Sequence, residues 1–284
     1  MRYFDPFPGA FAPEAETRED VAVRIWHQSM TELDGLSVYK TSLEGHARKL
    51  LDPEQTVEVH GMPKGTYRGR SPTAALSNAF ACHRLLDPVL DNALAAERQG
   101  FDAFVLGSFS EPFLFELRSA LDIPVVSVTE ASFFIACSIG RRIAPISNDP
   151  AITLMVRDSI DTHGLQQRIM APHAIRPALD EFQLAEAFAQ PAPLLQSFTE
   201  VARAAIAEGA DVIIPAEGVL SEFLYSNGVA MIDSVPVVDS FGATWIYAAM
   251  MVKLRAATGL SVSRKGHYQR EDPRLIAELG RNSS

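Results

Sequence analysis

Two short segments of this 284-residue chain resemble each other, and each ends an apolar run with a polar side chain. The first is GFDAFVLGSFSE, Gly100–Glu111, and the second is GADVIIPAEGV, Gly209–Val219. At a separation of 109 residues, Ser108 of the first segment matches Glu217 of the second. Short apolar runs that end in turns are typical of buried strands. Two similar halves would place Ser108 and Glu217 on opposite sides of one cleft, where both could act on a substrate.

The two side chains differ in the chemistry that they could perform. A glutamate is a competent general base, and burial in an apolar cleft would raise the pKa of Glu217 towards neutrality. A serine hydroxyl is too weak a base without an activating neighbour, so Ser108 could donate a hydrogen bond or, once activated, act as a nucleophile. The backbone amides after these positions could stabilise an oxyanion or enolate; they belong to Phe109, Ser110, Gly218 and Val219.

Further polar residues follow other predicted strands, at the edge where open α/β sheets bind ligands. The substrate contacts predicted from these strand ends are His27, Gln28, Ser29, Ser147 and Asn148. Glu130 and Asp239 follow two later strands, and we expect them to support the site by orienting its loops. Arg68 or Arg70 could pair with a substrate carboxylate, because a guanidinium offers a fork of donors.

The elements that must carry these residues alternate between strands and helices. The predicted strands are Val21–Trp26, Thr56–His60, Ala103–Leu106, Val125–Val128, Arg142–Ile146, Gln167–Ala174, Asp211–Ile214 and Val235–Val238. The predicted helices are one that begins within Met30–Leu36, then Thr73–Gln99, Pro112–Leu121, Ala131–Ile139 (buried), Thr153–His163, Leu195–Glu208, Val219–Ser226 and Phe241–Thr258. Such alternation predicts parallel sheets that are covered by helices on both faces.

We therefore predict an α/β fold with two similar lobes related by a pseudo-two-fold axis. Each lobe is a mainly parallel sheet flanked by helices, and the active cleft lies between the lobes. Residues 1–20 form an irregular arm, 21–140 the first lobe, 141–260 the second lobe and 261–284 a tail. The last long helix could pack back on the first lobe.

The composition limits the classes of partner. The net charge is −10, which argues against nucleic acid, because phosphate binding needs a basic face. The chain has no apolar run long enough for a membrane span and no secretory signal at its start, so we expect a cytoplasmic protein that does not bind membranes. The two cysteines form no metal pair, and no phosphate-binding glycine loop is present. We expect no metal and no cofactor, a small-molecule substrate, and a homo-oligomer.

Four motifs in order resemble the Asp/Glu/hydantoin racemase superfamily, in particular its hydantoin and allantoin racemase branch, over roughly residues 21–258. The family pattern GCFGDP corresponds to Gly107–Pro112 (GSFSEP), and PVVGIxEA to Pro124–Ala131 (PVVSVTEA). In the second half, GAxVIxLGCAGM corresponds to Gly209–Leu220 (GADVIIPAEGVL), and PVVDG to Pro236–Ser240 (PVVDS). The resemblance implies the two-lobed fold and a cofactor-independent isomerase.

The chain departs from the family pattern at both catalytic positions. In these racemases one thiolate takes the α-proton and the opposite thiol returns a proton to the other face. Here the two cysteines are replaced by Ser108 and Glu217, which leaves one competent base and one hydroxyl. The symmetric two-thiol mechanism is the outcome that this replacement supports least.

Three functions remain open from the sequence. In the first, Glu217 is a one-face acid/base and Ser108 a hydrogen-bond donor, which suits proton transfer next to a carbonyl of a small carboxylate or cyclic ureide, or a related lyase reaction. In the second, Ser108 is a nucleophile, activated by Glu217 or a histidine, in a hydrolase of cyclic amides or imides. In the third, the protein is a paralogue that binds a small ligand and catalyses nothing.

Overall fold

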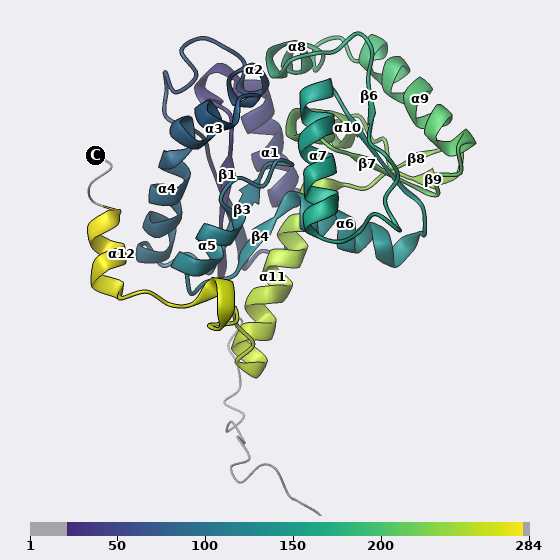
Figure 1. Ribbon diagram of the computed structural model, residues 1–284. Helices are drawn as coiled ribbons and strands as arrows, with labels where there is room; N and C mark the ends of the chain where they lie inside the picture. The colour runs from purple at the N-terminus through teal and green to yellow at the C-terminus, as the bar shows by residue number, and fades with distance from the viewer. Residues whose placement is uncertain (1–21, 281–284) are drawn as a thin grey trace, which may run out of the picture.

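The computed structural model describes residues 22–280 of the chain. Within them two lobes lie side by side, each with a parallel sheet and surrounding helices (Figure 1). This arrangement confirms the predicted α/β fold. The arm expected over residues 1–20 lies outside the described residues, and so do residues 281–284 of the predicted tail.

The first lobe is built on a four-stranded parallel sheet in the order β2-β1-β3-β4. All five residues of β3 are buried, which explains its unbroken apolar sequence. The strands are β1 (Val23–Ser29), β2 (Gln55–His60), β3 (Ala103–Gly107) and β4 (Val125–Ser127). The helices of this part of the chain are η1 (Leu33–Gly35), α1 (Ser37–Leu50), α2 (Pro72–Leu76), α3 (Ala79–Leu85), α4 (Asp87–Arg98), α5 (Leu114–Ala120) and α6 (Val128–Ile139), the last of which reaches under the second lobe and contacts β7 (Figure 1).

The second lobe has a three-stranded parallel sheet in the order β6-β5-β7 and a small antiparallel hairpin, β8-β9. Its strands are β5 (Ile143–Ser147), β6 (His173–Ala174), β7 (Val212–Pro215), β8 (Met231–Ile232) and β9 (Val235–Pro236). The helices of this half and of the chain end are α7 (Pro150–Thr162), α8 (Glu181–Glu186), α9 (Ala192–Ala207), α10 (Gly218–Ser226), α11 (Ser240–Thr258), η2 (Gly266–Tyr268) and α12 (Pro273–Leu279).

Two strands expected in the second lobe are shorter than predicted. The segment Gln167–Ala174 forms only the two-residue strand β6 and an isolated bridge from Ile169 to β5. The segment Val235–Val238 pairs mainly with β8, and only Val237 bridges to the parallel sheet. Both segments contain a proline, which lacks the backbone donor that a regular ladder needs.

Two helix predictions were wrong in their bounds. The expected helix Thr73–Gln99 is divided into α2, α3 and α4. Asn78 begins α3 as an N-cap, since its side chain accepts a hydrogen bond from the amide of Ala81. Pro88, in the first turn of α4, cannot continue the preceding helix. The helix expected to begin within Met30–Leu36 is α1, which starts only at Ser37 after the turn η1.

Helix α6 is not fully buried, contrary to its apolar sequence. Phe133 is buried, but Phe134, Ile135 and Ile139 are 38%, 37% and 55% exposed. A helix that is apolar on all sides usually lies inside a core, so the exposed apolar face of α6 is unusual.

The homo-oligomer stays a prediction that the single chain does not test.

Helix α11 and the segment after it pack on the first lobe (Figure 1). Trp245 of α11 donates a hydrogen bond from Nε1 to Nδ1 of His27 in β1, at 3.2 Å. Further along, Arg264 and Arg270 form ion pairs with Asp122, at the end of α5. These contacts attach α11 and the segment that follows it to the first lobe.

Two histidines tie the lobes together at related places. His46 of α1 lies between two carboxylates of the second half, with Nδ1 2.9 Å from Glu222 and Nε2 2.9 Å from Asp239. His163 of α7 lies between two carboxylates of the first lobe, 2.8 Å from Glu111 and 3.8 Å from Glu130. Helices α1 and α7 follow the first strand of each half, so the two contacts obey the internal repeat. We call them the interlobe histidine contacts.

We predict that the His46 contact makes the stability of the protein depend on pH. Burial alone would lower the pKa of His46, but its carboxylate partners outweigh burial and raise the pKa above 6.5. The folded state therefore holds a proton that the unfolded state releases, so this stabilisation is complete below about pH 6.5 and is lost as pH rises through the folded pKa. Urea unfolding over a pH series should show this loss in the wild type and a flatter profile in His46→Gln.

His46→Gln should also cost about 3–5 kcal/mol below pH 6.5, because it leaves the buried Glu222 carboxylate without its cation. The matched control is His83→Gln, at an exposed position of α3. A wild-type slope that His46→Gln leaves unchanged would show that His46 does not carry this dependence.

Candidate functional site

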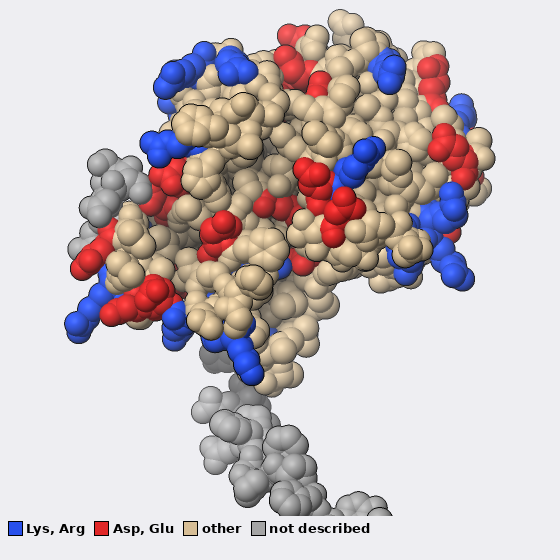
Figure 2. All heavy atoms as spheres, viewed as in Figure 1, with Lys and Arg blue, Asp and Glu red and all other residues tan. Residues whose placement is uncertain are grey.

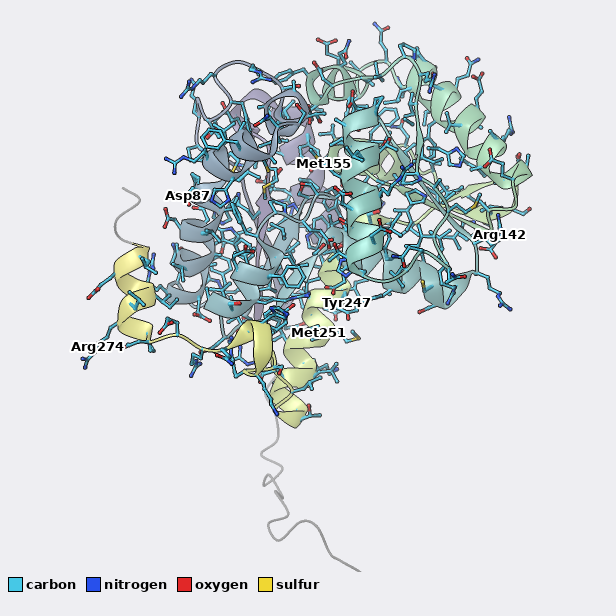
Figure 3. All side chains as sticks on the ribbon, viewed as in Figure 1. Asp87, Arg142, Met155, Tyr247, Met251 and Arg274 are labelled. Atoms are coloured by element: carbon cyan, nitrogen blue, oxygen red, sulfur yellow. The ribbon has the colours of Figure 1, made fainter. Side chains whose placement is uncertain are left out.

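A small cavity lies where the carboxyl ends of β1, β3 and β7 meet between the lobes. Its volume is about 50 Å³, well below the roughly 300–1,000 Å³ of a drug-sized ligand site. Six of the predicted site residues line it: Ser29, Ser108, Phe109, Ser110, Glu217 and Gly218. Figure 3 places another lining residue, Met155 of α7, between the two lobes. Ser108 and Glu217 therefore share one cavity, as the internal repeat predicts.

Glu217 is the N-cap of α10 and is only 7% exposed. Its Oε1 accepts a hydrogen bond from the amide of Val219 at 3.0 Å, and its Oε2 accepts one from the amide of Leu220 at 2.7 Å. Burial raises the pKa of Glu217 to about 8, with a further contribution from Glu181, while the amides of α10 act in the opposite direction. A carboxyl group with this pKa exchanges protons near neutral pH, as a general acid/base must.

Ser108 lies on the opposite wall, in the loop between β3 and α5. Its Oγ is 2.9 Å from the Oγ of Ser110 and accepts a hydrogen bond from the Ser110 amide at 3.3 Å. The same loop holds Glu111 and Phe113 in left-handed backbone conformations, with φ of 47° and 61°. Residues other than glycine rarely adopt this backbone conformation, so the loop is a constrained turn, and its Ser108 and Ser110 both line the cavity.

The structure does not bring His27 and Gln28 to the cavity. β1 continues to Ser29, so both residues lie within the strand and are fully buried. Burial lowers the pKa of His27 to about 3, so the imidazole is neutral. A Cβ atom at Gly107 would lie 2.6 Å from Nε2 of His27, so the ring fills the space beneath the turn to Ser108. Gln28 accepts hydrogen bonds from Trp26 and Asn92 on the other side of the sheet.

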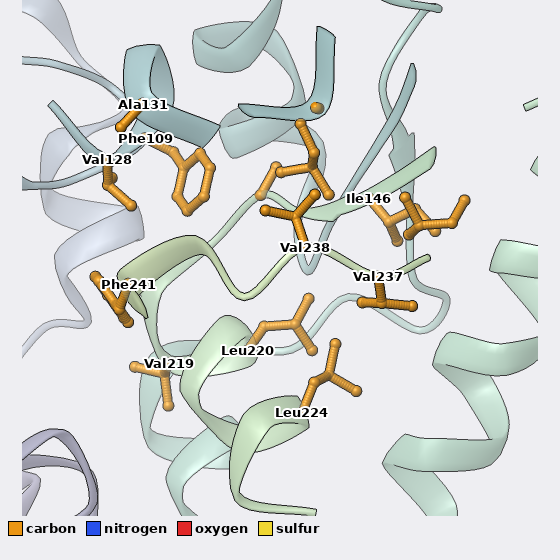
Figure 4. Close-up of a cluster of buried hydrophobic side chains, with 14 of the residues drawn as sticks. Phe109, Val128, Ala131, Ile146, Val219, Leu220, Leu224, Val237, Val238 and Phe241 are labelled. Carbon is orange, nitrogen blue, oxygen red and sulfur yellow. The ribbon is translucent and has the colours of Figure 1, made fainter. Parts of the chain in front are cut away.

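Ser147, Asn148 and Val219 also lie away from the cavity. Ser147 bonds to Thr153 at 2.7 Å, and Asn148 donates to the carbonyl of Leu179 at 2.7 Å. These two residues hold the chain after β5 in place and do not face Ser108. Val219 belongs to the core, where it packs with residues that include Val128 and Phe241 (Figure 4). Of the predicted site residues, the second half thus contributes Glu217 and Gly218 but not the strand end of β5.

The two predicted supporting residues belong to the interlobe histidine contacts. Asp239 accepts from His46 and also caps α11, since its Oδ1 accepts from the amide of Gly242. Glu130 lies in the first turn of α6 and not at a strand end, and it pairs with Arg118. Neither residue lines the cavity.

Several residues of the site were not expected from the sequence. Glu181 of α8 is 4% exposed, and its Oε1 accepts hydrogen bonds from the amide and the hydroxyl of Thr73 in α2. Both residues line the cavity, as do Thr31, Tyr39 and Ile152. Burial raises the pKa of Glu181. In the sequence, the feature that could have drawn attention to Glu181 is a capping box at Asp180–Gln183. A capping box marks where a helix starts, but it does not show in which direction the first side chain of the helix points.

The cavity contains acidic groups without a matching cation. No Lys, Arg or His is among the described residues that line it, whereas Glu181 and Glu217 both do. Arg68 and Arg70 are exposed and lie elsewhere. On the face shown in Figure 2, Lys and Arg are mixed with Asp and Glu and form no continuous basic field. The described residues hold no cluster of His, Cys, Asp and Glu that could bind a metal, and no helix among them could cross a membrane.

Comparison with known proteins gives one consistent family. The hydantoin racemase of Pseudomonas sp. (strain NS671) is 25% identical to this chain over 212 residues, which are 74% of this chain and 82% of that relative. The allantoin racemase of Pseudomonas fluorescens superimposes with a TM-score of 0.70 at 23% identity and covers 88% of this chain and 98% of its own. That of Klebsiella pneumoniae gives a TM-score of 0.67 at 23% identity, with 88% and 94% covered.

The family model described as Asp/Glu/hydantoin racemase matches residues 35–246, which include Ser108, Glu181 and Glu217. The match extends over most of the chain and through both lobes. This protein therefore belongs to the Asp/Glu/hydantoin racemase family.

Proposed function

We propose that this protein transfers a proton at a carbon next to a carbonyl group, with Glu217 as its single base. The observation that carries this proposal is a buried carboxyl with a pKa of about 8 that shares a cavity with Ser108 and Ser110. A group whose pKa lies near the working pH can both take and return a proton. We further propose that the reaction needs no cofactor and takes place in the cytoplasm in a homo-oligomer.

The charge of the cavity favours a neutral substrate. A carboxylate would have to lie beside Glu181 and Glu217 without a lysine, arginine or histidine among the described lining residues. Placing like charges together in a dry cavity is unfavourable. A cyclic ureide brings N–H donors and carbonyl acceptors without a charge, and relatives of this chain bear the names hydantoin racemase and allantoin racemase. We therefore propose a small cyclic ureide and disfavour an amino acid.

In the proposed reaction the Glu217 carboxylate takes the proton from the substrate carbon. The C–H electron pair moves into a C–C double bond, and negative charge develops on the carbonyl oxygen as an enolate. Return of the proton from Glu217 to the same face of the carbon regenerates the substrate, so this step is observed as exchange of the α-proton with solvent, and a net isomerisation requires the enolate to take up its proton at another atom. Ser108 faces the cavity from the opposite wall as a hydrogen-bonding group, so the proton leaves and returns on one face.

The hydrolase alternative has less support. A nucleophilic serine needs a base within hydrogen-bond reach of its hydroxyl. Ser108 has Ser110 as its side-chain neighbour, and Glu217 directs its two oxygens to the amides of α10. The catalytically inactive paralogue remains an outcome of the experiments below.

The first prediction concerns Glu217 as the base. In D₂O, wild-type protein should exchange the ring α-proton of a 5-substituted hydantoin, with a rate that rises with pH until Glu217 is ionised near pH 8. Glu217→Gln should lower the exchange rate by a factor on the order of 10²–10⁴, because an amide cannot accept the proton. Proton NMR measures the exchange, and Glu208→Gln, exposed at the end of α9, is the control.

Two results would contradict this assignment. Unchanged exchange in Glu217→Gln would remove the base role from Glu217. Ring opening in the same samples would identify a hydrolase, and binding without any exchange or product would identify an inactive paralogue.

The second prediction tests whether the proton leaves and returns on one face of the substrate. For a single enantiomer of the substrate, the wild-type protein should exchange the α-proton with solvent much faster than it converts that enantiomer into the other. Ser108→Cys should raise the ratio of racemisation to exchange, because a thiol of pKa about 8.5 can deliver a proton from the opposite wall. Chiral chromatography and NMR on the same samples give the two rates. Ser138→Cys, exposed on α6, controls for the chemistry of an added thiol; equal ratios in wild type and Ser108→Cys would rule out the opposed geometry.

The third prediction needs no substrate. The folded pKa of Glu217 is raised from 4.5 to about 8, so the folded state retains its proton where the unfolded state loses it. Wild-type stability should fall as pH rises from about 4.5 to 8, by an upper bound of roughly 4–5 kcal/mol at 1.4 kcal/mol per pKa unit. Glu217→Gln should lose this part of the slope in chemical unfolding. A slope shared by both proteins would place the Glu217 pKa near its ordinary value.

A further inference from the structure

Tyr39 of α1 places a phenol oxygen beside the backbone that follows the proposed base. The residue is 1% exposed and lines the cavity together with Ser29, Glu217 and Gly218. A Cβ atom at Gly218 would lie 3.1 Å from Oη of Tyr39, so this oxygen is next to the first residue after Glu217. Because the cavity holds only about 50 Å³, a molecule that contacts Glu217 also lies close to the phenol.

The surrounding structure holds the phenol in place. The ring packs in the core with Phe241, at 6.5 Å between the ring centroids. The Ser29 hydroxyl, at the carboxyl end of β1, hydrogen-bonds with the phenol. The Oγ of Ser29 is itself 2.9 Å from Oγ1 of Thr31 and accepts a hydrogen bond from the Thr31 amide at 3.3 Å. A donor that is fixed before the reaction needs no reorganisation during it.

The phenol keeps its proton over the pH range in which Glu217 can act as a base. Burial raises the pKa of Tyr39 well above its ordinary value of 10.0, the charges of Glu217 and Glu222 raise it further, and the Ser29 hydrogen bond acts in the opposite direction. The pKa of Glu217 is about 8. Ionisation of Glu217 therefore comes first and holds the proton on Tyr39 more firmly. The site then contains a carboxylate base and a neutral O–H donor together.

A phenol suits the charge that the proposed reaction develops. The enolate carries its negative charge on the carbonyl oxygen, and donors fixed at that position in a dry site lower the barrier. A phenol is a more acidic donor than the aliphatic hydroxyls of Ser108 and Ser110, so it forms the stronger hydrogen bond to an enolate. Phenols in apolar sites stabilise enolates in this way.

We propose that Tyr39 is a further catalytic residue, whose hydroxyl donates a hydrogen bond to the substrate carbonyl oxygen and stabilises the enolate. This inference rests on the proposed function above. When Glu217 takes the α-proton, the C–H bond breaks and its electron pair forms the C–C double bond. The carbonyl oxygen becomes negative and accepts the hydrogen bond more strongly. The phenol keeps its own proton, so no further reactant is needed, and reprotonation of the carbon restores the site.

Tyr39→Phe tests this role because it removes the hydroxyl and keeps the packed ring. The rate of α-proton exchange at saturating 5-substituted hydantoin should fall on the order of 10²–10³-fold, as loss of an oxyanion donor does. KM should change little, because the hydrogen bond strengthens only as the charge develops. The rise of the rate near pH 8, which Glu217 sets, should remain. Tyr247→Phe, the same change at a residue that does not line the cavity, should match wild type.

Gly218→Ala tests where the phenol oxygen lies. The added methyl group would press on Oη, which must give by a few tenths of an ångström. Exchange should fall on the order of tenfold, because small displacements of a catalytic group are costly. In Tyr39→Phe the oxygen is absent, so adding Gly218→Ala should cause little further loss. Losses that multiply in the double variant would place the oxygen elsewhere and overturn the inference.

Fluorinated tyrosine separates a hydrogen-bonding role from a structural one. Site-specific 3-fluorotyrosine at position 39 is a more acidic donor of nearly the same shape, so exchange should equal or exceed that of wild type. Exchange as low as in Tyr39→Phe would overturn the inference, and so would unchanged exchange in folded Tyr39→Phe or an effect on KM alone. Thermal melts show which proteins fold, and the fluorinated protein decides if Tyr39→Phe does not.

The protonation of Tyr39 can be measured without a substrate. Wild type and Tyr39→Phe should show the same tyrosinate absorbance up to pH 10, since Tyr39 keeps its proton there. Ionisation of Tyr39 below that pH would overturn the inference, because a phenolate cannot donate. Wild type that exchanges no hydantoin proton would remove the proposed function, and this role with it. Active wild type with unchanged Tyr39→Phe would remove only the role of Tyr39.

Discussion

The chemistry proposed for this protein depends on one constraint, a carboxyl group that is buried without a positively charged partner. Glu217 has a pKa near 8 because the lobes exclude water from its cavity and the described lining offers no lysine, arginine or histidine. In water the same group would be an anion with little tendency to hold a proton at neutral pH. The two lobes must therefore stay closed around it, and the two interlobe histidine contacts join them through ion pairs on related helices.

The scaffold is nearly symmetric, whereas the chemistry on it is not. The repeated strand and turn bring Ser108 and Glu217 to one cavity, and the histidines of α1 and α7 follow the same pseudo-two-fold relation. Only one of the two central positions carries a group that titrates near neutral pH. A second buried carboxyl of the cavity, that of Glu181, comes from α8, which the internal repeat does not match with another element. The fold is thus nearly symmetric. The site is asymmetric because different side chains occupy the strand ends and the connecting segments of the two lobes.

The sequence predicted correctly which residues share the cavity where the argument rested on the repeat, and did so less well where it rested on strand ends. Ser108, Ser110 and Glu217 line the cavity as expected, because the matched segments share one backbone course. His27 was placed wrongly, because β1 continues beyond Trp26 and takes the imidazole into the core beneath Gly107. A pattern of apolar residues does not reveal that a polar side chain will be buried inside a strand.

By itself the sequence determined the α/β class, the two lobes, the matched pair of Ser108 and Glu217 and the loss of both family cysteines. These follow from local patterns and from the repeat, which are properties of the chain alone. Only the tertiary structure decided the pKa of Glu217, the partners of the histidines and the presence of Glu181 in the cavity. The physical reason is that burial and charge act through space, and residues 108, 181 and 217 meet only after the lobes close.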